Sequence, residues 1–171
     1  MIFGYSGSGK STLAQLISKE YNLPILYIDK ILYDANWKKR DDNASLNDIK
    51  SFLIHNKNWI VDGNGISKMF YERAELADKI IFMDLGPIQC YKNAKERYKK
   101  YKNLPRESRP DGCPEKFDLS FKMWILFNGR KKKRRQSFSN LVENYKHKVI
   151  FIKNKKDISY LLDNLDVLLL K

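Results

Sequence analysis

An eight-residue glycine-rich motif near the start of the chain constrains its fold more than any other feature. Residues 4–11 read Gly-Tyr-Ser-Gly-Ser-Gly-Lys-Ser, which matches the pattern G-x-x-x-x-G-K-[ST]. The apolar residues Ile2 and Phe3 precede it, and Thr-Leu-Ala-Gln-Leu follows as the opening of a helix. A short strand, a glycine loop and a helix form the context in which this motif makes a phosphate-binding loop, or P-loop.

The residue types of the motif predict how a nucleotide is bound. Glycines let successive backbone N–H groups point at phosphate oxygens, and the helix that follows adds its positive end. Lys10 is expected to reach the β- and γ-phosphates, and the Ser11 hydroxyl is expected to bind Mg²⁺. The predicted ligands are therefore ATP and Mg²⁺, and the predicted nucleotide-binding residues are Gly4, Ser6, Gly7, Ser8, Gly9, Lys10, Ser11 and Thr12.

Composition limits the class of protein. At 171 residues and 43% hydrophobic content, the chain has the size of one domain with a buried core. Cys90 and Cys113 do not lie in a pattern of metal ligands, so no structural zinc is expected. No stretch reaches the ~20 apolar residues of a membrane span, and the apolar start is too short for a signal peptide, so we expect a cytoplasmic location. The formal charge of +13 predicts an acidic partner.

The alternation of short apolar runs with segments of helical period predicts an α/β fold with a parallel sheet. The runs that read as strands are residues 1–3, 25–28, 59–61, 80–85 and 149–152. Right-handed crossovers between parallel strands bring their carboxyl ends to one edge of the sheet. The active site is expected at that edge.

Three of the predicted strands finish in an aspartate: Asp29, Asp62 and Asp84. A phosphotransferase needs one carboxylate near Mg²⁺ and often another near the acceptor hydroxyl. A strand-end aspartate is also commonly a helix cap or a turn residue, and for any one of the three the two interpretations weigh about equally. Asp62 gains weight because Gly63-Asn64-Gly65 follows it, a loop that permits close approach to a ligand.

The segment from Pro87 to Lys148 is too long for one crossover helix, and its middle is rich in proline and charge. It is expected to form a helix, a loop and two further helices. Two apolar faces at helical spacing, Phe117 to Ile125 and Phe138 to Tyr145, favour packing over base stacking. Six of the eight arginines lie within residues 97–135, which predicts a mobile lid at 97–135 inside a single domain of 1–171. Its loop at 104–114 has too few apolar residues to anchor itself.

The chain resembles adenylate-kinase-like P-loop proteins, and among them the bacterial DNA topology modulation (FlaR-like) family. The resemblance runs nearly end to end and depends on the P-loop, on Tyr-Ile-Asp at 27–29, on Trp-Ile-Val-Asp-Gly-Asn at 59–64, and on Arg-Pro-Asp-Gly-Cys-Pro-Glu-Lys-Phe-Asp at 109–118. It implies a three-layer P-loop NTPase sandwich whose five-stranded parallel sheet has the order 2-3-1-4-5, with a helical lid.

The resemblance also implies roles for single residues. Asp62 corresponds to the carboxylate beside Mg²⁺, so the implied metal-binding pair is Ser11 and Asp62, and Asp29 lies toward the acceptor. Arg109 matches the arginine before Pro-Asp in the family pattern, and Arg130 and Arg134 lie where lid arginines are expected. Together with Lys10 these residues form the predicted catalytic set. The chain lacks the arginine that nucleoside monophosphate kinases usually carry just after the third-strand Asp-Gly.

Three functions remain open at this point. The first is a kinase of a nucleotide or another small molecule. The second is a nucleic-acid-binding regulator that uses ATP as a switch, which the run Arg-Lys-Lys-Lys-Arg-Arg at 130–135 and five lysines within residues 92–102 favour. No helix-turn-helix, zinc or RNA-recognition signature supports it. The third is a slow NTPase without a transfer substrate.

Overall fold

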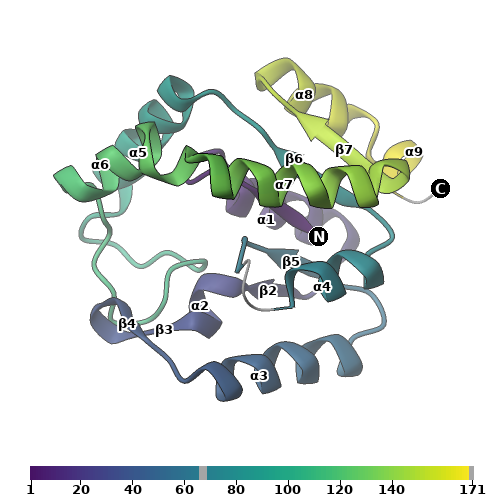
Figure 1. The fold of residues 1–171 in the computed structure, drawn as a ribbon, viewed down its shortest axis with the longest axis horizontal. Coiled ribbons are helices and arrows are strands. Elements are labelled where there is room, and N and C mark those ends of the chain that lie inside the picture. The colour runs from purple at the N-terminus through teal and green to yellow at the C-terminus, as the bar shows by residue number, and fades with distance from the viewer. Residues whose placement is uncertain (66–68, 170–171) are drawn as a thin grey trace.

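The computed structural model describes residues 1–65 and 69–169 of the chain. Its centre is a five-stranded parallel sheet (Figure 1). Across the sheet the strands follow the order β2 (Ile25–Tyr27), β5 (Ile60–Asp62), β1 (Ile2–Gly4), β6 (Ile80–Met83) and β7 (Val149–Ile152). Counted along the chain among these five strands, the order is 2-3-1-4-5. The predicted α/β fold and sheet order are confirmed.

The predicted strands differ from the observed ones by one or two residues at some ends. The strand predicted at 25–28 stops at Tyr27, because the buried Ile28 starts helix α2 (Ile28–Leu32) and packs with Ile49 and Val61 in a second small core. The strand predicted at 80–85 stops at Met83. The apolar pattern continues past both strand ends because those side chains remain buried after the backbone has turned.

One face of the sheet is covered by aromatic packing. Residues paired in a parallel sheet point to the same side, so Phe3 and Phe82, which are paired, share a face and stack with ring centroids 4.6 Å apart. Phe138 of α7 (Lys132–Asn144) packs 5.2 Å from Phe3, and Phe70 of α4 (Phe70–Leu76) packs 5.5 Å from it. Helices α4 and α7 therefore cover this face, which is the near face in Figure 1.

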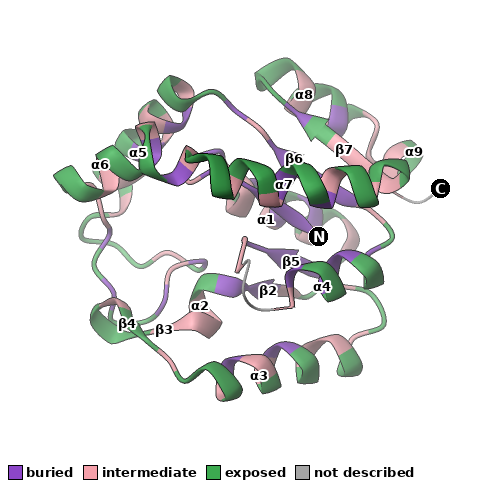
Figure 2. Ribbon diagram, in the orientation of Figure 1, coloured by how far each residue is buried: buried purple, intermediate pink, exposed green. Residues whose placement is uncertain are grey.

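The opposite face carries the helix that follows the P-loop. Helix α1 (Lys10–Tyr21) contacts β1, β2 and β5 and buries Leu13, Ala14 and Ile17. Helix α3 (Asp42–His55) buries Ile49 against the β2 edge, and α8 (Lys155–Asp163) buries Leu161 in the main core. The final helix, α9 (Leu165–Leu169), is tied to α1 by a hydrogen bond of 2.6 Å between Tyr21 and Asp166. The buried residues concentrate in the sheet and the inner helix faces (Figure 2).

The segment predicted as helix, loop and two helices has that organisation. Helix α5 (Pro87–Tyr101) is followed by a loop, α6 (Leu119–Leu126), the short 3₁₀ helix η2 (Asn128–Arg130) and α7; the 3₁₀ helix η3 (Lys146–Lys148) leads into β7. Ile125, Phe138 and Leu141 are buried, which confirms packing as their role. Phe117 lies before α6 rather than on it, and its ring packs against Tyr91 and Tyr98.

A small hairpin after α2 was not predicted. It consists of β3 (Tyr33–Asp34), the 3₁₀ helix η1 (Ala35–Trp37) and β4 (Lys38–Lys39), which pairs antiparallel with β3. Strands of two residues leave too little periodicity to detect in a sequence. Among the helices of the described residues, none is long and apolar enough to cross a membrane.

Candidate functional site

The backbone of the P-loop requires glycine at the positions where the motif supplies it. Gly7 has φ 79°, and a Cβ atom there would collide with the carbonyl oxygen of Cys90. Gly9 has φ 96° and is the residue directly before α1. Residues with a side chain rarely adopt such φ values, so the loop can take this course only with glycine at both positions.

The remaining predicted nucleotide-binding residues line the turn between β1 and α1. Gly4 ends β1, Thr12 is exposed in the first turn of α1, and the buried Ser8 hydroxyl has no hydrogen-bond partner in the described part of the chain. The Ser6 hydroxyl accepts a hydrogen bond of 3.2 Å from the Trp124 indole. No side chain of the described residues caps the first turn of α1, so its N–H groups and its positive end can serve an anion.

Lys10 lies close to two of the predicted aspartates. Its ammonium group donates a 2.9 Å hydrogen bond to the Tyr5 carbonyl oxygen, within the P-loop itself. Burial lowers the pKa of Lys10, whereas the negative charges of Asp62 and then Asp29 act in the opposite direction. A cation that is partly removed from water interacts strongly with the phosphates it binds.

Asp62 is the buried carboxylate of the site. It is 5% exposed, and its Oδ1 atom has no hydrogen-bond partner among the described residues. Burial raises the pKa of Asp62 to about 6, although Lys10 and a hydrogen bond from the Ser11 hydroxyl lower it. The unpartnered oxygen beside a serine hydroxyl fits Mg²⁺, which binds through one or two protein oxygens and takes its other ligands from water and phosphate. The described residues contain no group of three or more side chains suited to a metal.

The other two aspartates occupy different surroundings. Asp29 does not end a strand as predicted: it is exposed in the first turn of α2, because the chain becomes helical directly after Tyr27. Its charge still acts on Lys10 and Asp62. Asp84 follows β6, and the charges that act on it are those of Arg130 and Lys153. The structure therefore groups Asp29 and Asp62 with Lys10, and it places Asp84 with Arg130.

Arg73 is a residue that the sequence did not single out. It is fully buried, and its guanidinium donates to the carbonyl oxygens of Asn64 at 2.5 Å and Gly65 at 3.2 Å, with Met69 and Gly63 as further acceptors. Asn64 in turn accepts a 3.0 Å hydrogen bond from the Gly4 N–H. Arg73 thus fixes the loop after Asp62, and that loop is joined to the P-loop strand.

Two of the three predicted lid arginines lie near the start of the P-loop. The Arg130 guanidinium stacks 3.7 Å from the ring centroid of Tyr5 and donates to the Leu85 carbonyl oxygen at 2.6 Å. Arg134 lies 4.8 Å from the ring centroid of Trp124, the residue that donates to Ser6. Both cations therefore stand beside the first residues of the phosphate loop.

Arg109 lies in a different cluster, around a buried glutamate. Glu115 has a side chain that is 1% exposed, and its carboxylate faces Arg97 Nε at 2.6 Å, Arg106 Nε at 3.1 Å and Arg109 Nη1 at 3.7 Å. Arg109 also donates to the carbonyl oxygens of Tyr101 and Leu104. The sequence did not identify Glu115 or Arg97 as partners, because they are 18 residues apart and no local pattern links them.

The loop at 104–114, predicted to have too few apolar residues to anchor itself, has polar contacts that the prediction did not include. Polar groups hold it against the β3–β4 hairpin: Trp37 donates its indole N–H to Pro114 at 2.9 Å, and Asn36 donates its backbone N–H to Gly112 at 3.1 Å. At the other end of the loop, Glu107 accepts hydrogen bonds from Gln15 and Tyr27. Counting apolar residues missed these contacts because backbone groups and charged side chains form them.

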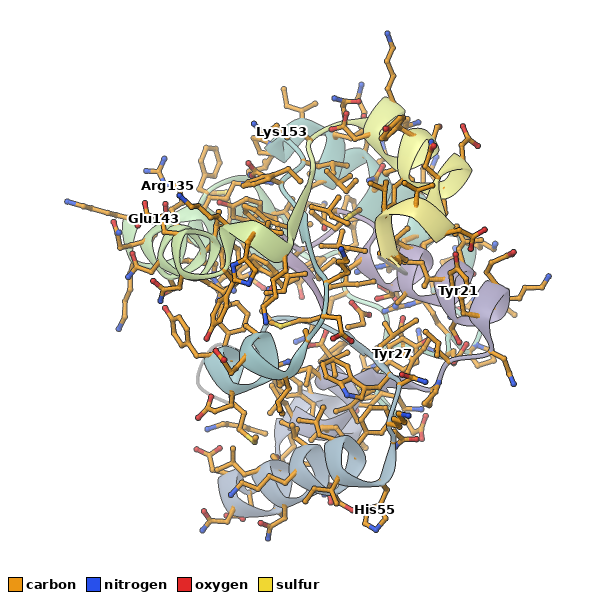
Figure 3. All side chains as sticks on the ribbon, turned by 90° about the vertical axis from the view of Figure 1, so that its right-hand side faces the viewer. Tyr21, Tyr27, His55, Arg135, Glu143 and Lys153 are labelled. Carbon is orange, nitrogen blue, oxygen red and sulfur yellow. The ribbon has the colours of Figure 1, made fainter. Side chains whose placement is uncertain are left out.

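Replacing Glu115 with Gln is expected to loosen this loop. The change removes the one carboxylate that three buried or half-buried arginines share, and breaking a buried ion pair typically costs about 3–5 kcal/mol. Amide hydrogen exchange in residues 104–116 should become at least ~100-fold faster, since 1.4 kcal/mol corresponds to about tenfold. Glu143→Gln, at an exposed position of α7 (Figure 3), is the matched control. Unchanged exchange in the loop would contradict the bracing role of Glu115.

Known structures share this fold. Deoxyadenosine kinase from M. mycoides with bound dATP matches 96% of this chain and 97% of its own, with a TM-score of 0.54 and 13% identity. Shikimate kinase from Bacteroides thetaiotaomicron matches 99% and 96%, with a TM-score of 0.49 and 16% identity. The match to deoxyadenosine kinase shows that the chain has a P-loop kinase-like fold. No family model and no curated protein matches it, so the FlaR-like membership is not confirmed.

Proposed function

We propose that this chain is an ATP- and Mg²⁺-dependent phosphotransferase that acts on a hydroxyl group of a nucleotide or another small molecule. The observation that carries the proposal is the convergence of three groups at one end of the sheet. These are the Lys10 ammonium, the Ser11 hydroxyl and the buried, partly unpartnered carboxylate of Asp62. The fold shared with P-loop kinases supports it.

On the donor side, the P-loop would hold the phosphates of ATP. The N–H groups of the loop and of the first turn of α1 bind phosphate oxygens, and Lys10 exchanges its hydrogen bond with Tyr5 for one with the β- or γ-phosphate. Ser11 and Asp62 would hold Mg²⁺, which supplies neutralisation of the charge on the β- and γ-phosphates. Because Asp62 is buried, its charge acts on that ion with little screening by water.

On the acceptor side, Asp29 is proposed as the general base. The acceptor hydroxyl oxygen forms a bond to the γ-phosphorus, and the bond from that phosphorus to the bridging oxygen breaks, so that ADP leaves with this oxygen. The hydroxyl proton passes to the Asp29 carboxylate. The exposure of Asp29 and its influence on both Lys10 and Asp62 support this role.

The proposed lid at 97–135 would add positive charge during transfer. Arg130 and Arg134, beside Tyr5 and Trp124, are placed to balance charge on the transferred phosphoryl group. For Arg109 to reach that group, its hydrogen bonds to the Tyr101 and Leu104 carbonyl oxygens have to be released. Closure of the lid therefore requires a rearrangement within the loop.

The FlaR-like assignment is also part of the proposal, and it depends on the motifs at 59–64 and 109–118. A direct role in DNA binding ranks second. Its support is the run Lys131, Lys132, Lys133 and Arg135, all exposed, whereas Arg134 stacks on Trp124. A DNA-binding titration at increasing salt measures this role, because contacts to many phosphates make affinity fall steeply with salt.

A screen of hydroxyl-bearing acceptors tests the kinase proposal. We expect that at least one nucleoside, nucleotide or hydroxy acid raises ADP release at least ~10-fold above hydrolysis in its absence, since a positioned acceptor replaces water. Phosphorylated acceptor should appear in equal amount to ADP. If ATP is hydrolysed at one rate whatever is added, the chain is a slow NTPase; if ATP is neither bound nor hydrolysed, the proposal fails altogether.

A further inference from the structure

The cluster around Glu115 holds more positive charge than its one carboxylate can neutralise. Arg97 and Arg106 each bring an Nε atom within 3.1 Å of a Glu115 oxygen, and Arg109 adds a third cation at 3.7 Å. One guanidinium group, with two parallel N–H donors, is enough to pair both oxygens of one carboxylate and to neutralise its charge. Holding two further cations half-buried is unfavourable unless another anion joins them, and burial already lowers the pKa of Arg97.

The three arginines differ in the donors they have left. Arg109 uses both of its Nη groups on the carbonyl oxygens of Tyr101 and Leu104. Arg106 gives Nη1 to the Ser108 hydroxyl. Three Nη groups have no hydrogen-bond partner among the described residues: both Nη groups of Arg97 and the second Nη group of Arg106. These donors can still bind an anion.

The same two arginines act on the candidate site. Burial lowers the pKa of Lys10 and the charge of Arg97 acts in the same direction, whereas burial raises the pKa of Asp62 and the charge of Arg106 opposes it. Besides Glu115, Asp29 interacts with the charge of Arg97 and Asp62 with that of Arg106, and the nearby Glu107 already accepts hydrogen bonds from Gln15 and Tyr27. Arg97 and Arg106 are therefore near enough to Lys10, Asp62 and the proposed base Asp29 for their charges to act on these residues.

We infer that Arg97 and Arg106, which both pair with Glu115, form a subsite for an anionic group, a carboxylate or a phosphate monoester, on the phosphoryl acceptor. This inference rests on the proposed function, because it assigns the chemistry of that function's acceptor. The planar guanidinium fork matches both anions, and its half-buried position strengthens the interaction. The acceptor is then a hydroxyl compound that carries a negative charge, such as a hydroxy acid or a phosphorylated alcohol, rather than a neutral nucleoside or polyol.

The test measures binding of inorganic phosphate and of malonate to the full chain by titration calorimetry. The P-loop is first saturated with Mg²⁺ and a non-hydrolysable ATP analogue, so that phosphate cannot bind there. We expect at least one of the two anions to bind, and we expect Arg97→Met and Arg106→Met each to weaken it about tenfold to a hundredfold, the range for losing a hydrogen bond to a charged group. The more tightly bound anion identifies the group on the acceptor.

Controls separate this inference from the proposed function and from misfolding. Arg135→Met removes an exposed charge of α7 (Figure 3) and should leave anion affinity unchanged. Arg106→Lys keeps the charge but not the fork, so it should weaken binding several-fold even if Arg106→Met does not fold. If the chain binds no nucleotide, the proposed function fails, and a titration in the Lys10→Ala background still reports on the arginines. The subsite would be overturned if the wild type bound neither anion, or if the Arg106 variants bound the anion as tightly as the wild type does.

Discussion

Replacing Lys10 with Ala is expected to lower phosphoryl transfer by about 10²–10³-fold, while the chain remains folded. Among the described residues, the Lys10 side chain makes one hydrogen bond, to the Tyr5 carbonyl oxygen, and it is not part of either hydrophobic core. Burial lowers its pKa, which shows that the folded protein holds this cation at a cost in free energy. Removing this cation therefore weakens the binding of the phosphates and their transfer much more than it changes the stability of the fold.

Turnover, affinity for the Mg²⁺ complex of ATP and the thermal midpoint measure this prediction together. Ser11→Ala should give the same pattern, because the Ser11 hydroxyl is hydrogen-bonded to Asp62 and is proposed to bind the metal. Lys19→Ala, an exposed lysine in the last turn of the same helix, is the matched control and should change none of the three quantities. Wild-type affinity and turnover in both the Lys10 and the Ser11 variants would remove the basis for the P-loop assignment.

Replacing Asp62 with Asn is expected to have opposite effects on activity and stability. Turnover should fall about 10²-fold or more, because the lost charge acts on the transferred phosphate through Mg²⁺, whereas nucleotide affinity measured without Mg²⁺ should change little. In the metal-free chain without nucleotide, the variant should be more stable than the wild type near neutral pH. Residues selected for a function often carry such a cost in stability.

The pH dependence follows from the raised pKa of Asp62, about 6 in the folded chain against 3.8 as the ordinary value. The folded state holds this proton more tightly than the unfolded state does, so the free energy of unfolding of the wild type falls as pH rises from about 4 to about 6. Asn has no such titration. The stability difference between variant and wild type should therefore grow across that window, by at most about 3 kcal/mol for a shift of about two pKa units, and stay constant above pH 7.

Urea unfolding at a series of pH values, followed by Mg²⁺-dependent kinetics, measures both effects. Asp163→Asn, near the end of α8, serves as the control for a change of one carboxylate. A stability difference that does not vary between pH 4 and pH 7 would show that Asp62 is not a strained buried carboxylate. Equal losses of nucleotide binding with and without Mg²⁺ would show that it does not act through the metal.

The candidate site could be located in the sequence where its residues are contiguous. Residues 4–11 encode the course of their own backbone, since the left-handed φ values at Gly7 and Gly9 depend on the residue type at each position. Asp62 could be singled out for a similar reason: it lies at the end of an apolar strand and precedes a glycine loop. The parallel sheet could be predicted from the alternation of apolar runs and helical segments. A parallel sheet is buried on both faces, so its strands are apolar and helices connect them.

Contacts between distant parts of the chain were decided by the tertiary structure alone. Whether Asp29 ends a strand or begins a helix depends on Ile28. The Ile28 side chain packs in the second small core, to which α3 contributes Ile49. The meeting of Arg97 with Glu115, the grouping of Asp84 with Arg130, and the contact of the loop at 104–114 with Trp37 join residues that no local pattern connects. Such contacts arise from how helices and loops pack on the sheet, and the energy of an ion pair or hydrogen bond depends on the distance and burial that this packing sets.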